Sequence, residues 1–153
     1  GHLVFSTLHT NDAPSAVTRL QDMGIDNYLI SSSVLGVMAQ RLVRRICPNC
    51  KEKVPLTEEE AELLNLDTAT LPEIHRGRGC DRCGQTGYRG RVGIYELFVM
   101  SDDIRHVING GGDAATIRHQ AIKEGLRTLR QDGLNKLYEG VTTPEEIARV
   151  TRY

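Results

Sequence analysis

The four cysteines of this chain form two matched Cys-x-x-Cys pairs. Cys47 and Cys50 make the first pair, Cys80 and Cys83 make the second, and 29 residues separate the two pairs in a chain of 153. Tetrahedral zinc takes four thiolates, and one Cys-x-x-Cys turn supplies two of them. The pattern therefore predicts one Zn²⁺ that clips the intervening residues into a small lobe, although this spacing is longer than that of ordinary zinc ribbons.

Other thiol chemistries explain the pattern less well. Residues 1–10 lack the regions of a secretory signal peptide, and disulfides are rare in reducing compartments. A redox Cys-x-x-Cys of the thioredoxin type needs one pair, so the second would be surplus. Iron–sulfur clusters generally use other spacings and are a minor alternative. Because four cysteines leave no open position for water, the predicted zinc is structural.

Several basic residues crowd the two pairs. Zinc with four thiolates carries a net charge of −2, which nearby cations would offset. An ordinary solvated basic face would show the same residues, and the sequence leaves both interpretations open. These residues are Arg44, Arg45, Lys51, Lys53, Arg82, Arg89 and Arg91.

The composition is that of an ordinary globular protein. Hydrophobic residues make up 39% and charged residues 25%, which fits one domain, or one domain with a lobe. The sequence has no run of 18 apolar residues, so no bilayer span is predicted. With a net charge of −1 and only 5% aromatic residues, nucleic-acid binding is not expected.

The first part of the chain predicts alternating strands and helices. Residues 2–8 have the composition of a buried strand. A helix is expected from the N-cap Asp12 to about Met23, where Gly24 would end it. A second helix is expected over residues 27–40, followed by a short strand at 42–46. The apolar face of that second helix would comprise Ile30, Val34, Val37 and Met38.

The second part predicts one more strand and a helical tail. Thr57 followed by Glu60 is a capping-box pattern, which places a helix between the cysteine pairs. Residues 91–99 read as a strand. Thr143, with Pro144 next and Glu146 three positions on, is a strong helix start. Ser101 and Asp113 are further candidate N-caps, and the glycines expected to divide the tail are Gly125, Gly133 and Gly140.

Two histidines flank the first predicted strand. His2 lies near its start and His9 just past its end. In open α/β sheets, ligands bind where loops leave the carboxyl ends of strands. An imidazole there can hydrogen-bond a phosphate oxygen or an attacking water. The residues alone fit equally well a second interpretation, in which His9 and Asn11 only hold a turn.

Residues 1–13, GHLVFSTLHTNDA, resemble the histidine box of the secretion and type IV pilus ATPases of the GspE/PilB branch. The resemblance covers essentially the whole chain and is specific in combination. In that family, a tetracysteine insertion separates assembly ATPases from retraction ATPases, which typically lack it. The further matching segments are VTRLQDMG (17–24), QRLVRRICPNC (40–50), CDRCGQTGYRGRVGIYE (80–96), TLRQDGLNKL (128–137) and TTPEEIARVTR (142–152).

The resemblance implies a hexameric, RecA-like ATPase that drives assembly of pseudopilus or pilus fibres. It implies a cytoplasmic location at the bacterial inner membrane, with platform proteins and further copies of the chain as partners. By the same resemblance, His9 would act near the γ-phosphate of ATP, and His2 would support the site. Arg41 is a further nucleotide-binding candidate, although an ion pair with a carboxylate at a helix end explains it nearly as well.

Two motifs that such an enzyme needs are missing. The sequence contains no G-x-x-x-x-G-K-[ST] loop, nor any Gly-Lys dipeptide, and no Walker B acidic residue for Mg²⁺. We therefore expect the chain to begin inside the nucleotide-binding domain and not to hydrolyse ATP alone. The expected fold class is α/β, a partial RecA-like domain without its N-terminal half. Its parts would be the ATPase portion (1–46), the zinc lobe (47–83), a return strand (84–100) and a helical subdomain (101–153).

One alternative from another class stays open: a self-standing, zinc-stabilised module that docks to a secretion platform at the inner membrane. Two further zinc readings are weaker. A nucleic-acid-binding ribbon lacks the basic surplus, and Gly84 and Gly87 do not fall at the glycine positions of the zinc repeats in J-domain co-chaperones.

Overall fold

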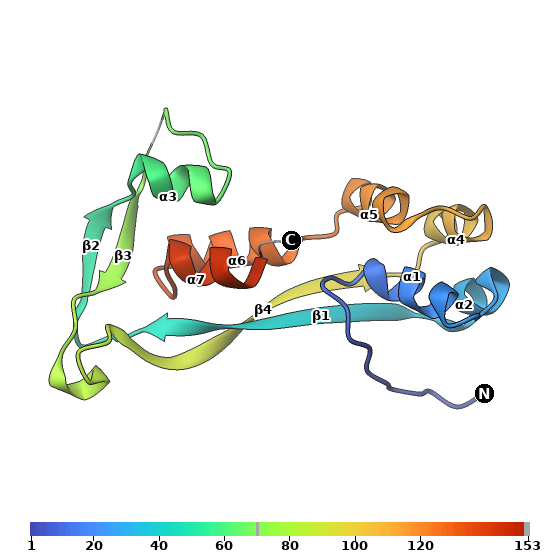
Figure 1. Ribbon diagram of the computed structural model, residues 1–153, viewed down its shortest axis with the longest axis horizontal. Coiled ribbons are helices and arrows are strands. Elements are labelled where there is room, and N and C mark those ends of the chain that lie inside the picture. Colours follow the sequence, from blue (N-terminus) through green and yellow to red (C-terminus); the bar gives the residue numbers. More distant parts are fainter. Residues whose placement is uncertain (70, 152–153) are drawn as a thin grey trace. The chain divides into compact units, whose positions relative to one another are not determined.

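The computed structural model describes residues 1–69 and 71–151 (Figure 1). Residues 70, 152 and 153, which belong to the predicted zinc lobe and helical subdomain, lie outside the described residues. Contacts group the chain into two compact units, each considered by itself below. The first unit comprises residues 1–39 and 96–128, and the second comprises residues 40–95 and the chain from 129 onward. Helices and strands occur together, so the α/β class is confirmed.

Two long strands, β1 (Gly36–Ile46) and β4 (Tyr88–Val99), pair with each other and run through both units. Their predicted parts at 42–46 and 91–99 are confirmed, and both strands begin earlier than expected. Along β4 the side chains of Ile94, Glu96 and Phe98 are buried and those of Tyr95, Leu97 and Val99 are exposed, the period of two that a sheet requires.

The first unit carries four helices: α1 (Ser15–Asp22), α2 (Asn27–Ser33), α4 (Asp102–Asn109) and α5 (Ala114–Lys123). The predicted N-caps at Ser101 and Asp113 are confirmed, because their side chains accept from the backbone N–H groups of Ile104 and Thr116. Gly24, at φ 82°, ends the first of these helices as predicted. The buried core comprises Ala13, Val17, Ile30, Phe98, Met100, Ile104, Ile108, Ile117 and Ala121.

The predicted helix over residues 27–40 is only half right. It ends at Ser33, and residues from Gly36 onward join β1. A side chain at Gly36 would lie 2.9 Å from the carbonyl oxygen of Phe98, so the strands approach closely there. Of the predicted apolar face, Ile30 is buried, whereas Met38 is 62% exposed. Pairing with β4 over a long sequence distance overrides the local helical pattern.

The predicted strand at residues 2–8 is wrong for this chain. The segment has no regular structure, and its large apolar side chains Val4 and Phe5 are 77% and 88% exposed. A strand needs a neighbour for its backbone N–H and C=O groups. Among the described residues, the two sheets contain β1 with β4 and β2 with β3, and neither includes this segment.

Among its described residues, the second unit holds a hairpin and three α-helices. Strands β2 (Lys51–Pro55) and β3 (Glu73–Gly77) are antiparallel, with Val54 opposite Ile74. The capping box at Thr57 is confirmed and starts α3 (Glu58–Leu63). Helices α6 (Leu129–Tyr138) and α7 (Pro144–Thr151) complete the unit. Its core joins the hairpin lobe to these two helices and comprises Leu56, Ala61, Leu64, Ile74, Leu137, Ile147 and Ala148.

The tail glycines have two different roles. Gly125 and Gly140 follow helices at φ 98° and 68°, which confirms them as helix ends. Gly133 lies inside α6 instead, where an added Cβ would sit 3.0 Å from Cγ2 of Ile147. The absence of a side chain at Gly133 thus allows the close packing of α6 on α7.

No helix within residues 1–69 and 71–151 combines the length and apolar content that crossing a bilayer requires.

Candidate metal centre

The Sγ atoms of Cys47, Cys50, Cys80 and Cys83 lie within 4.8 Å of one another. The Sγ–Sγ distance is 3.9 Å for Cys47 and Cys80, 3.9 Å for Cys50 and Cys83, and 3.7 Å for Cys80 and Cys83. A zinc–sulfur bond of about 2.3 Å gives a tetrahedron with sulfur–sulfur edges of about 3.8 Å. All four cysteines are free thiols, so the cluster has the size and chemistry of a tetrahedral metal site.

Backbone hydrogen bonds shape the two cysteine turns and join them. The N–H of Cys83 donates to the carbonyl of Cys80 at 3.1 Å, in the short 3-10 helix η1 (Asp81–Cys83), and Gly84 follows in the left-handed region. The N–H of Cys47 donates to the carbonyl of Gly87 at 2.9 Å. The first turn is therefore tied directly to the loop that follows the second.

Two glycines let these loops meet. A Cβ on Gly77, at the end of β3, would overlap the carbonyl oxygen of Gly87, and a Cβ on Gly87 would overlap that of Gly77. Gly87 also has φ 76°, a value that side chains other than that of glycine rarely adopt.

The environment favours a thiolate at Cys83. Burial acts to raise its pKa, but the N–H groups of Cys80 and Gly87, at 3.2 and 3.3 Å from its sulfur, outweigh burial and lower the pKa to about 6. Burial raises the pKa of the Cys50 thiol to about 12. A cation bound among the four sulfurs would favour deprotonation of all four thiols.

The basic residues around the cluster are all exposed. Exposed charges are screened by salt and solvent, so the positive field at the cysteines is modest. Among these residues, Arg44 has the most specific environment: its guanidinium carbon lies 4.1 Å from the centroid of the Tyr88 ring.

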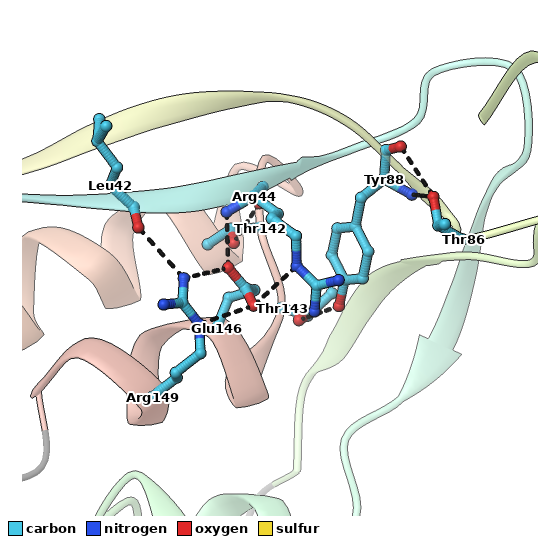
Figure 2. Close-up of polar contacts among 8 residues, drawn as sticks. All are labelled: Leu42, Arg44, Thr86, Tyr88, Thr142, Thr143, Glu146 and Arg149. Atoms are coloured by element: carbon cyan, nitrogen blue, oxygen red, sulfur yellow. Dashed lines mark hydrogen bonds and ion pairs between the residues drawn. The ribbon is translucent and has the colours of Figure 1, made fainter. Parts of the chain in front are cut away.

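Glu146 is a buried carboxylate with a different role from the one predicted (Figure 2). Glu146 was predicted to complete a capping box with Thr143. Its side chain is 1% exposed, and it accepts from the backbone N–H and the Nε of Arg44, at 2.7 and 3.0 Å. Arg149 donates to the same carboxylate from Nε and Nη2, at 3.1 and 2.8 Å. Tertiary contacts therefore engage this side chain. The spacing of three residues between Glu146 and Arg149 is a local signal for half of these contacts, whereas the contact with Arg44, 102 positions away, has none.

These contacts fasten α7 to β1 and β4. Burial acts to raise the pKa of Glu146, but the hydrogen bonds from Arg149 and Arg44 outweigh it and lower the pKa to about 2. The Thr142 hydroxyl donates to the carbonyl of Arg44 at 2.8 Å, and the hydroxyls of Tyr88 and Thr143 are 2.8 Å apart. We refer to Arg44, Tyr88, Thr142, Thr143, Glu146 and Arg149 as the Glu146 cluster.

The predicted nucleotide-site residues lie elsewhere. His2 and His9 are on the exposed N-terminal segment of the first unit. Arg41 is on β1 in the second unit, where its Nη1 donates to the carbonyl of Gln40 at 3.3 Å. The roles assigned to these three residues stay predictions.

The fold and the cysteine cluster together define an α/β protein with four thiols placed closely enough to hold one metal ion. The family model described as "Type II/IV secretion system protein" matches residues 1–149, and the chain belongs to this family. It is 54% identical to the type II secretion system protein E of Pseudomonas aeruginosa over 152 residues, which is 99% of this chain and 30% of that protein.

Two further relatives represent both branches that the sequence resembles. The chain is 47% identical to the type II secretion system ATPase E of Vibrio cholerae, across 99% of the chain and 30% of that protein. It is 48% identical to the type IV pilus assembly ATPase PilB of Thermus thermophilus, across 96% of the chain and 17% of that protein. The chain thus spans less than a third of these relatives.

Proposed function

We propose that this chain is the C-terminal part of an ATPase that powers assembly of a type II secretion pseudopilus or a type IV pilus, and that its four cysteines hold one structural Zn²⁺. The observation that carries the metal assignment is the convergence of four Sγ atoms at the spacing of a tetrathiolate site. Identity of 47–54% to secretion and pilus proteins, two of them named as ATPases, supports the wider function.

The zinc acts by closing the open end of the β2–β3 hairpin. Cys50 directly precedes Lys51, which pairs with Gly77, and Cys80 follows three residues later. The metal therefore joins both strand ends at the side of the hairpin away from α3. Each thiolate fills one coordination position, so the site holds structure and does no hydrolytic chemistry.

In the complete protein, we place the RecA-like nucleotide site partly on this chain. His9 would contact the γ-phosphate or the attacking water, His2 would support it, and Arg41 would contact the nucleotide. The phosphate-binding loop and the Mg²⁺ ligands would come from the remainder of the protein. The assembled enzyme would be a hexamer at the cytoplasmic face of the inner membrane, against platform proteins of the secretion or pilus machine.

Metal analysis of the reduced chain tests the zinc assignment. We expect one zinc per chain by elemental analysis, and its loss in a Cys83→Ser variant. Stoichiometric iron, or no metal in well-folded material, would refute the assignment. A phosphate-release assay should show no ATP turnover by the chain alone and turnover by the complete protein. Turnover by the chain that depends on His9 would contradict the proposed division of the site.

A self-standing interaction module would need the same metal but no ATPase partner half. The matches to named ATPases across 96–99% of the chain favour the motor. Deleting the chain's segment from the complete protein separates the two: a motor loses ATP turnover, whereas an appended module loses only its docking.

A further inference from the structure

The N-terminal segment passes from exposed to buried between His9 and Asp12. Residues 1–9 are exposed, whereas Asp12 and Ala13 are 5% and 0% exposed. The Thr10 hydroxyl donates to the carbonyl of Asp12 at 3.0 Å, which tightens the turn between them. The position and direction in which His9 leaves the core are therefore set by whatever holds residues 10–13.

A buried carboxylate holds the backbone of this turn. The N–H of Ala13 donates to Oε1 of Glu96 at 2.8 Å, and Glu96, on β4, is 1% exposed. The two residues are 83 positions apart in sequence. Because a buried N–H without an acceptor is costly, this bond fixes the turn against the strand.

An ion pair holds the same turn from the other side. Oδ2 of Asp12 pairs with Nη2 of Arg118 on α5, and Oδ1 of Asp12 accepts from the N–H of Ser15 at 2.9 Å. The Asp12 side chain is 7% exposed and that of Arg118 is 35% exposed, so the carboxylate is shielded from solvent while the guanidinium is partly exposed. Arg105 and Asp102 on α4 form a contrasting pair, 3.6 Å apart, in which the Asp102 side chain is 95% exposed.

We propose that Arg118 and Glu96 are positioning residues for His9: they hold the turn of residues 10–13 against α5 and β4 and so fix where the imidazole can reach. This inference rests on the proposed role of His9 at the nucleotide. Arg118 and Glu96 act through the turn and touch no nucleotide. A shift of α5 would then alter the placement of His9, which couples this helix to ATP turnover.

The test uses the complete protein and compares Arg118→Met with a matched control, Arg105→Met, which removes the exposed pair on α4. We expect Arg118→Met to lower kcat for ATP by roughly 10- to 100-fold, the loss typical of a misplaced catalytic group, with KM nearly unchanged. Arg118→Lys should recover part of kcat, and Arg105→Met should retain the wild-type value.

A double-mutant cycle separates positioning from general destabilisation. Asp12→Asn keeps an oxygen for the N–H of Ser15 and removes only the charge that Arg118 pairs with. Adding Arg118→Met to Asp12→Asn should therefore lower kcat no further. If the fold-losses of kcat in the two single variants multiply in the double variant, Asp12 and Arg118 do not act through their ion pair, and the proposal is refuted. Glu96→Gln keeps an acceptor for Ala13 and should retain more kcat than Glu96→Met.

Backbone dynamics of the isolated chain provide a second readout that needs no activity. Nuclear magnetic relaxation of the N–H groups at residues 9–11 should show faster motion in Arg118→Met than in wild type or Arg105→Met. Unchanged relaxation would refute the proposal even if the variant were inactive for other reasons.

His9→Ala in the complete protein separates the proposed role of His9 at the nucleotide from the proposed positioning role of Arg118 and Glu96. Wild-type kcat in His9→Ala would refute the proposed role of His9 and this inference with it. An inactive His9→Ala together with wild-type kcat in Arg118→Met would refute the positioning role alone and leave the proposed function standing.

Discussion

Removal of the metal should unfold the second unit as a whole, including the C-terminal helices. The lobe contributes few large buried side chains, among them Leu56, Leu64 and Ile74, and these pack in one cluster with Leu137 and Ile147 of α6 and α7. Because the lobe and the helices α6 and α7 share this core, unfolding of the lobe would expose the apolar side chains of the two helices to water. Cys83→Ser, or chelation of wild type, is therefore expected to expose both the hairpin and the two helices.

The size of the effect follows from the site. A structural zinc contributes apparent binding free energies of roughly 10–16 kcal/mol in small peptides. A whole domain is stable by only about 5–15 kcal/mol. Loss of the metal should thus remove most or all of the stability of this unit. The first unit has its own core around Phe98 and Ile117, which contains no metal ligand, so it should stay folded.

Hydrogen exchange read by mass spectrometry resolves the two units. Peptides within residues 51–77 and 129–151 should lose protection together after chelation, and peptides within residues 15–33 and 102–123 should keep it. Chelator should change nothing further in Cys83→Ser, which serves as the control. Retained protection of residues 129–151 in the metal-free chain would refute the reasoning, because it would show that α6 and α7 are stable without the lobe.

Three smaller perturbations probe the surroundings of the centre. The carboxylate of Glu146 has its pKa lowered to about 2, so its contribution to stability is present above pH 4.5 and is lost as pH falls toward 2. Glu146→Gln should lower the free energy of unfolding by up to about 3 kcal/mol at pH 7. In urea unfolding, the stability of the variant should also fall less steeply as pH decreases from 4.5 to 2. The same dependence of stability on pH in both proteins would contradict this. Gly87→Ala should lower both the melting temperature and zinc affinity in a chelator competition, whereas Gly90→Ala, at φ 79° with open space around it, should cost only about 1–2 kcal/mol and leave affinity unchanged. Tyr88→Phe should cost about 1 kcal/mol in denaturant unfolding by losing its hydrogen bond to Thr143, and Tyr88→Leu should cost more, because the stack with Arg44 is lost as well.

The features that the sequence predicts well are those decided within a few residues. The N-caps at Thr57, Ser101 and Asp113 accept hydrogen bonds from backbone N–H groups three positions on, so a stretch of four residues is enough to predict them. Gly125 and Gly140 end helices because a positive φ suits glycine, again a local cause. The convergence of the four cysteines in one cluster was predictable for a chemical reason, since few functions need two Cys-x-x-Cys turns in one chain.

The features that the sequence missed are decided by contacts far along the chain. Residues 36–40 have a helical apolar spacing, yet they belong to a strand that pairs with β4, far along the chain. Gly133 resembles a helix end but allows contact with Ile147 on the next helix. Glu146 has the spacing of a capping box, but its carboxylate accepts hydrogen bonds from Arg44 and Arg149. In each case a local signal exists and a tertiary contact outweighs it.

The metal centre and the Glu146 cluster act on neighbouring positions of the same two strands. Arg44 lies three residues before Cys47 on β1, and Tyr88 follows Gly87, whose carbonyl accepts from Cys47. The proposed metal would fix the ends of these strands, and the contact of the Arg44 guanidinium with the Tyr88 ring holds them together further along. The carboxylate of Glu146 on α7 accepts hydrogen bonds from both the backbone N–H and the side chain of Arg44, so order at the four thiols can be transmitted to α7 through these two short contacts. This continuity is the physical reason for expecting the hairpin and the C-terminal helices to unfold together when the metal is removed.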